Sequence, residues 1–176
     1  MRTKNLGEID GTPVQDWAAV AAVLDEGILQ APDAGGPNRH TCWLATINPD
    51  GSPHVTPVGA AWVDGTFWFQ TGDTTRKAKN LLRDPRCTTS VAVKDFDLTF
   101  DGAAEKVVEP ADVSRIVAAW AAGGWPCEVD ESGVGITAPF NAPAVGPPPW
   151  FVYRMTPRSA VSVCNVEPGG TTRWTW

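Results

Sequence analysis

The sequence lacks the residues and motifs that mark most metal- and nucleotide-dependent proteins. Its 176 residues include only two histidines, His40 and His54, and its four cysteines form no C-x-x-C pair. We therefore predict no metal site, and we expect the thiols to be small buried side chains. It has no P-loop, no G-x-S-x-G motif and no G-x-G-x-x-G after a strand. Kinase, hydrolase and dinucleotide-binding functions thus lose their main support.

Long apolar runs are missing as well. No stretch approaches the ~18 apolar residues of a membrane span, and the first residues lack the apolar core of a signal peptide. We therefore expect a cytoplasmic protein with no membrane partner. The formal net charge of -6 also disfavours binding to nucleic acid. The length suits one domain with its own core, which we expect to span residues 1–176.

Short apolar runs separated by turn residues dominate the pattern. We expect strands at residues 42–48, 53–63, 66–71, 88–93, 97–108, 150–156, 159–165 and 171–176. Helical spacing predicts helices over residues 16–30 and 111–122, and a third between the turn at 72–73 and Asp84. Many short strands with few helices favour a mainly β, closed or partly closed antiparallel barrel with flanking helices. The Gly- and Pro-rich residues 125–149 receive no assignment.

Two residues interrupt the strand pattern. Pro57 has no amide donor, so its strand is an edge strand, is bulged, or leaves a neighbouring backbone free for a ligand. Gly102 marks a candidate bulge in the strand at 97–108.

The helix after residue 71 begins with two cations. Asp73 or Thr74 can cap this helix. Arg76 and Lys77 then fall in its first turn, where the helix dipole prefers anions. A bound phosphate would make this arrangement favourable, because the free amides and both cations would converge on it. The alternative is a solvated basic turn close to the acidic Asp73 and Asp84.

The basic residues are concentrated near this turn. Five of the 14 Lys and Arg residues lie between Arg76 and Arg86. A local cluster on an acidic chain suits a small anionic ligand better than a polyanion. Helical spacing places Ala78, Leu81 and Leu82 on one face of the same helix, which we expect to be its buried face.

Several segments, taken together, resemble the pyridoxamine 5′-phosphate oxidase-like superfamily of flavin and deazaflavin split-barrel proteins. The likeness covers roughly residues 41–108 in register. The segments are Leu44-Ala45-Thr46, Asp50-Gly51-Ser52-Pro53-His54-Val55-Thr56-Pro57-Val58, Phe69-Gln70-Thr71, Thr75-Arg76-Lys77-Ala78-Lys79-Asn80-Leu81 and Asp84-Pro85-Arg86.

The resemblance implies a fold, an assembly and a cofactor site. The fold is a six-stranded antiparallel split β-barrel, and the assembly is a homodimer with cofactor sites in the groove between subunits. The backbone of Val55, Thr56 and Val58 would hydrogen-bond the ring edge, helped by the missing donor of Pro57. Thr71 and Thr75 would offer hydroxyls to the phosphate, and Arg76 and Lys77 would supply charge. Asn80 is a further candidate near the phosphate or ribityl end.

The resemblance also bears on cofactor and substrate. The Lys-Asn-Leu and Asp-Pro-Arg pieces look closer to the branch that uses the deazaflavin coenzyme F-420, while FMN stays open. Pyridoxamine phosphate oxidases proper hold their substrate with an Arg and a His near the C-terminus. Here Arg173 has no such His, which argues against the vitamin as substrate.

The implied function is an oxidoreductase that transfers hydride between the cofactor and a small conjugated or aromatic substrate. Two alternatives remain at this point: a non-catalytic flavin- or haem-binding carrier, and an FMN-dependent enzyme of the pyridoxamine phosphate oxidase type. No catalytic residue is assigned. His54 either protonates a substrate or, as we favour, faces solvent. Four tryptophans are candidates to line the acceptor site, although packing is favoured for each: Trp62, Trp68, Trp150 and Trp174.

Overall fold

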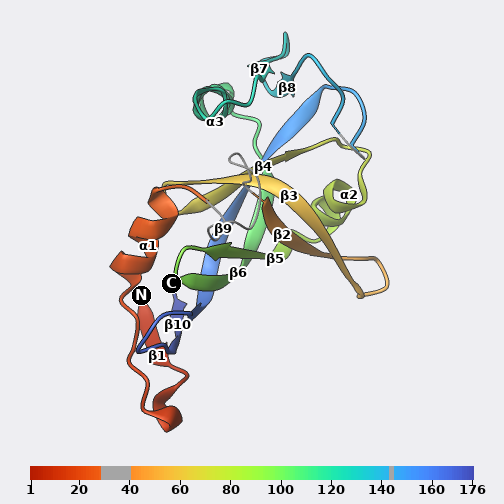
Figure 1. Ribbon diagram of the computed structural model, residues 1–176. Coiled ribbons are helices and arrows are strands. Elements are labelled where there is room, and N and C mark those ends of the chain that lie inside the picture. Colours follow the sequence, from red (N-terminus) through yellow and green to blue (C-terminus); the bar gives the residue numbers. More distant parts are fainter. Residues whose placement is uncertain (29–40, 143–144) are drawn as a thin grey trace.

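The computed structural model describes residues 1–28, 41–142 and 145–176, arranged as Figure 1 shows. His40 and the last two residues of the helix predicted over residues 16–30 lie outside this part of the chain. No described helix combines the length and the apolar character that a membrane crossing requires.

Six antiparallel strands close into the barrel that the sequence predicts. They are β2 (Thr41–Ile47), β3 (Pro53–Val63), β4 (Thr66–Thr71), β5 (Arg86–Val93), β6 (Phe96–Lys106) and β9 (Trp150–Cys164). They pair in the order β9-β4-β3-β2-β5-β6, and β6 pairs with β9 to complete the ring. Tight turns join β2 to β3 and β3 to β4, where Gly51 and Gly65 supply φ angles of 84° and 73°. The predicted fold class is confirmed.

Two more strands extend the sheet beyond the ring. β10 (Thr171–Thr175) pairs with β9, and β1 (Arg2–Asn5) pairs with β10. Both lie at the lower end of the molecule in Figure 1, where the two chain ends are neighbours. The sequence does not predict β1, because its four residues carry no apolar side chain; the open edge of β10 orders it instead. A short 3-10 turn, η1 (Glu8–Asp10), follows β1.

Large apolar side chains fill the barrel. The rings of Phe67 and Phe100 meet edge to face, with centroids 4.8 Å apart. α1 (Trp17–Asp25) packs against this core and begins at Asp16, whose carboxylate accepts a hydrogen bond from a first-turn amide. The helix is shorter than the predicted stretch 16–30, because Gly27 takes a φ of 110° and ends the helical path.

A second hydrophobic core lies against the outer faces of β4 and β9. α3 (Pro110–Ala122), β7 (Glu128–Val129) and β8 (Gly135–Thr137) build it at the upper end of the molecule in Figure 1. It encloses residues of β4 and β9 that point away from the barrel interior. β7 and β8 fall in the segment 125–149, which the sequence leaves unassigned.

The four candidate acceptor-site tryptophans all pack in these cores. Trp62 and Trp174 belong to the barrel core, whereas Trp68 and Trp150 belong to the second core. Each is at least nine-tenths buried. The packing interpretation is confirmed for all four.

One long strand, β9, replaces the two that the sequence predicts over 150–156 and 159–165. Pro157 suggests a break between them because it cannot donate to a ladder. The chain instead runs through Pro157 without leaving the sheet.

A β-bulge makes this continuity possible. β6 pairs Asp101 with Ser159 but pairs the next residue, Gly102, with Pro157, so Arg158 is an extra residue on β9. The bulge predicted at Gly102 is confirmed. A Cβ atom at Gly102 would lie 2.2 Å from the carbonyl oxygen of Thr156, so only glycine fits there.

Candidate functional site

The turn between β4 and α2 (Arg76–Arg83) presents a helix N-terminus to the surface. Thr75 caps this helix, and its hydroxyl accepts a hydrogen bond from the amide of Ala78 at 3.3 Å. The predicted caps, Asp73 and Thr74, are therefore wrong. Asp73 instead accepts hydrogen bonds from Lys106 at 2.8 and 3.0 Å, which holds it away from the helix amides.

The two cations predicted for phosphate binding occupy the first two positions of α2. Arg76 is exposed and Lys77 is half-buried. Burial lowers the pKa of Lys77, since a partly desolvated ammonium is disfavoured. Among the described residues, no carboxylate forms an ion pair with either side chain. The turn therefore holds two cations without an ion-pair partner among the described residues. A carboxylate close to the turn is that of Asp50, which lines a pocket with Arg76 and whose pKa is lowered by its hydrogen bond to Ser52 and by the charge of Arg76.

The carboxylates expected to neutralise the turn are engaged elsewhere. Asp73 pairs with Lys106 at 2.8 Å, and Asp84 pairs with Arg86 at 2.6 Å. Hydrogen bonding to Arg86 lowers the pKa of Asp84 to about 2. Neither acid therefore neutralises the turn, and the alternative of a solvated basic turn stays open, because Arg76 is exposed.

The hydroxyls of Thr71 and Thr75 both serve the turn itself. Their oxygens are 3.0 Å apart, and Thr75 also donates to the carbonyl of Gly72 at 2.9 Å. Thr71 is fully buried. Their role as phosphate ligands stays a prediction, and the bonds seen here fix the shape of the turn that presents the two cations.

Asn80 ties α2 to the end of β2. The residue is only 1 % exposed, and its amide donates to the hydroxyl of Thr46 at 3.1 Å and to the side-chain oxygen of Asn48 at 3.2 Å. Its proposed contact with the cofactor stays a prediction. What its hydrogen bonds do is set the position of the helix against the barrel wall.

The exposed face of α2 differs from the expected one. Ala78 and Leu81 are buried as predicted, but Leu82 is 90 % exposed, so the prediction for Leu82 is wrong. The helix touches the barrel along a narrow stripe, because the buried positions are Ala78, Asn80 and Leu81. The third buried residue of the helix is the polar Asn80 and not the predicted Leu82.

The first half of β3 has a free backbone edge. β4 pairs only with Ala60–Val63 of β3, so residues 53–59 pair with β2 alone within the described chain. Pro57 lies in this half, opposite Trp43, as the edge-strand prediction requires. The predicted ring-binding residues, Val55 to Val58, therefore lie where backbone groups on one side have no strand partner. Val55 is 57 % exposed, whereas Val58 is buried.

Gln70 is a candidate site residue that sequence reasoning did not single out. It follows Phe69, the last residue of β4 that pairs with β3. Its side-chain oxygen is buried and has no hydrogen-bond partner among the described residues. Buried acceptors are normally satisfied, so this oxygen next to the free edge fits a donor supplied by a ligand. The one signal for Gln70 in the sequence is its place in Phe69-Gln70-Thr71, a segment that carries the family resemblance.

Two pockets border the β2–β3 hairpin. The first, of about 470 Å³, is lined by Asn48, Pro49, Asp50, His54 and Arg76, and so joins the hairpin to the start of α2. The sequence-based prediction is that His54 faces solvent. Its side chain is in fact half-buried and lines this pocket together with Arg76, a candidate phosphate ligand.

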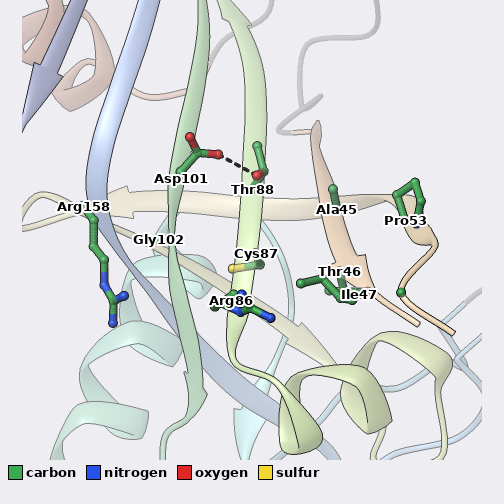
Figure 2. Close-up of a pocket in the computed structure, with 11 residues that line it drawn as sticks. Ala45, Thr46, Ile47, Pro53, Arg86, Cys87, Thr88, Asp101, Gly102 and Arg158 are labelled. Atoms are coloured by element: carbon green, nitrogen blue, oxygen red, sulfur yellow. Dashed lines mark hydrogen bonds between the residues drawn. The ribbon is translucent and has the colours of Figure 1, made fainter. Parts of the chain in front are cut away.

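The second pocket lies on the outer face of the barrel, on the other side of the hairpin. Its volume is about 410 Å³, and Figure 2 shows that β2, β5, β6 and the bulge of β9 supply its walls. Ala45, Ile47 and Pro53 give it an apolar wall beside the free edge of β3. Arg86 and Arg158 are its two cations. We call it the outer pocket.

A comparison with known families decides the wider assignment. The family model described as pyridoxamine 5′-phosphate oxidase matches residues 28–138, which is well over half of the chain. The chain belongs to this family. The match spans β2 to β8. It therefore includes the β2–β3 hairpin that borders both pockets, the free edge of β3 and the cationic turn of α2. The family typically binds flavins. None of the curated proteins matches the chain.

Solved structures share the fold of this pyridoxamine 5′-phosphate oxidase family member. The conserved hypothetical protein Rv2991 from Mycobacterium tuberculosis is 26 % identical, with a TM-score of 0.57 and coverage of 86 % of each chain. A Clostridium acetobutylicum protein related to general stress protein 26, of the pyridoxinephosphate oxidase family, is 14 % identical, with a TM-score of 0.56 and coverage of 89 % of this chain and 92 % of its own.

PhzG from Burkholderia lata 383 is a third structure of this kind. It was solved in complex with tetrahydrophenazine-1-carboxylic acid and is 14 % identical, with a TM-score of 0.55 and coverage of 91 % of this chain and 83 % of its own. At this identity the likeness concerns the fold.

Proposed function

We propose that the protein is a flavin- or deazaflavin-dependent oxidoreductase that transfers hydride between its cofactor and a small conjugated or aromatic substrate. The cofactor is the deazaflavin coenzyme F-420 or FMN. The active assembly is a cytoplasmic homodimer with the cofactor groove between its subunits. The observation that carries the proposal is the half-buried Lys77 beside Arg76 at the start of α2, neither of which forms an ion pair within the described residues.

A phosphorylated ring cofactor fits the groups present. The first-turn amides of α2 and the two cations suit a phosphate. The free edge along residues 53–59 and the orphaned oxygen of Gln70 suit the donors and acceptors at the rim of a flavin ring. When bound, such a cofactor supplies the hydride-transfer chemistry. The residues of this chain bind it, orient it and keep water from its face.

Titration of the purified protein with FMN and with F-420, side by side, tests the cofactor assignment. We expect saturable binding of at least one of them, followed by absorbance and fluorescence. Arg76→Ala combined with Lys77→Ala should weaken it more than tenfold, because two charge-assisted contacts to the phosphate are lost. Lys79→Ala is the matched control, since this exposed lysine lies on the same helix but outside its first two positions. Equal affinity in the double variant and in Lys79→Ala would exclude the phosphate clamp, that is, binding of the cofactor phosphate by Arg76 and Lys77.

A turnover assay separates an enzyme from a carrier. We expect the reduced cofactor to be consumed when a quinone or an enone is added, in proportion to the concentration of protein. Tight cofactor binding without any consumption across such acceptors would assign the protein as a carrier. An absorbance band of haem in the purified protein would point to the same class.

A further inference from the structure

The bulge of β9 determines to which side of the barrel wall the side chain of Arg158 points. Along the upper part of the strand Tyr153 and Met155 face the barrel core, while Trp150 and Val152 are buried on the opposite side in the second core. Along the lower part the buried residues are Ala160 and Ser162. The inward side thus changes from odd to even residue numbers, and the extra residue Arg158 is where the change occurs. In an unbroken strand that alternates inward with Ala160 and Ser162, residue 158 would face the barrel core.

The bulge instead turns Arg158 to the outside, into the outer pocket. Figure 2 shows its guanidinium at one side of the pocket, across from Arg86. The amide of Trp176 donates to the carbonyl of Arg158 at 3.0 Å and so holds this backbone in place. Bulges recur beside functional sites because they re-aim a side chain.

The charged groups of the outer pocket are not equivalent. Arg86 forms an ion pair with Asp84 at 2.6 Å, so its charge is already matched. Asp101 accepts a hydrogen bond from Thr88 at 2.7 Å, and Figure 2 shows this pair at the opposite end from both arginines. Arg158 has no ion pair within the described residues. It is therefore the cation of this pocket that is free to bind an anion.

The walls and the size of the pocket define the rest of the ligand. About 410 Å³ lies within the range of small-molecule sites. Ala45, Ile47 and Pro53 offer an apolar wall, and Ala45 pairs with Val55 of the free edge of β3, so the pocket adjoins the proposed position of the cofactor ring. An acceptor seated there would lie beside the ring.

We propose that the outer pocket binds the acceptor substrate, that this substrate is a flat, mainly apolar molecule with a carboxylate or similar anionic group, and that Arg158 is the specificity-determining residue that binds this group. The proposal rests on the function proposed above, and it narrows the substrate class to acids. Thr88 and Asp101 offer hydrogen-bonding groups at the far end of the pocket.

The test compares two probes of the same shape, 2-naphthoate and the neutral 2-naphthamide, by calorimetric titration of the full chain without added cofactor. We expect naphthoate to bind at least tenfold tighter, equivalent to ~1.4 kcal/mol. Arg158→Ala should reduce this preference to less than threefold, and Arg158→Lys should keep most of it, since the charge remains. Arg2→Ala is the matched control, because Arg2 is an exposed arginine of β1 that does not line the pocket.

Equal binding of the two probes, or a preference that Arg158→Ala leaves intact, would overturn the proposal. The titration is then repeated with protein saturated with FMN or F-420, and displacement of naphthoate by either would overturn the assignment to the acceptor. Because the first titration contains no cofactor, a protein that selects naphthoate through Arg158 but binds neither flavin would refute the proposed function and leave the acid-binding pocket standing.

Discussion

Replacing the buried amide of Asn80 tests the link between fold and site most directly. Asn80→Ala removes two hydrogen bonds, to Thr46 at 3.1 Å and to Asn48 at 3.2 Å, from a side chain that is 1 % exposed. Each bond contributes roughly 1 kcal/mol net. Thr46 keeps its own hydrogen bond to the carbonyl of His54, so the unpaired acceptor left behind is mainly that of Asn48.

These contributions add up to a loss of roughly 2–3 kcal/mol in the free energy of unfolding. In a chain of this size each kcal/mol lowers Tm by about 2–4 °C, so we expect a fall of about 4–12 °C by thermal denaturation. Cofactor affinity should fall as well, because the start of α2 is no longer held against β2.

Leu82→Ala provides the comparison on the same helix. Leu82 is 90 % exposed, so its truncation removes little packing and should change Tm by less than about 2 °C. If Asn80→Ala and Leu82→Ala proved equally stable, or if Asn80→Ala lost stability while cofactor affinity stayed unchanged, the amide would not be what positions the clamp.

Three further predictions concern the bulge and the clamp. Gly102→Ala should lower the free energy of unfolding by roughly 3 kcal/mol or more in urea titrations, because its Cβ would lie 2.2 Å from the backbone oxygen of Thr156. Gly59→Ala is the control and should be nearly neutral, because a Cβ atom there would have nothing within 4 Å. Equal losses of stability in the two variants would contradict the bulge geometry. Burial lowers the pKa of Lys77 below its ordinary 10.5, so the unfolded state keeps this proton to higher pH, and stability without ligand should rise with pH across that interval. Affinity for a phosphorylated cofactor should fall over the same interval as the ammonium loses its charge, and Lys77→Arg should abolish the fall in a pH series of titrations.

The sequence predicts those parts of the fold that local chemistry determines. β3 and β4 have the predicted bounds, because Pro53, Gly65 and the β-branched and aromatic residues between the turns all favour the same conformation. The cationic first turn of α2 is also where the sequence places it. Local signals agree with the tertiary structure in this region, so pattern reasoning succeeds.

The remaining features depend on contacts between distant segments. The cap of α2 is Thr75 because Lys106, far along the chain, engages Asp73. The strand β1 exists because β10 offers it an edge. The orphaned oxygen of Gln70 has no signature in the sequence, since burial without a partner is a property of the packed structure.

The single extra residue in β9 has a consequence for how the chain can change. Without Arg158, Pro157 and Ser159 would become neighbours opposite Gly102 and Asp101, and the strand would alternate in and out of the barrel along its whole length. Loss of any residue below the bulge, such as Val161, would instead turn one half of β9 inside out. The alternation of the strand thus has no need of Arg158, and the effect of the extra residue is to place a cation at the outer pocket.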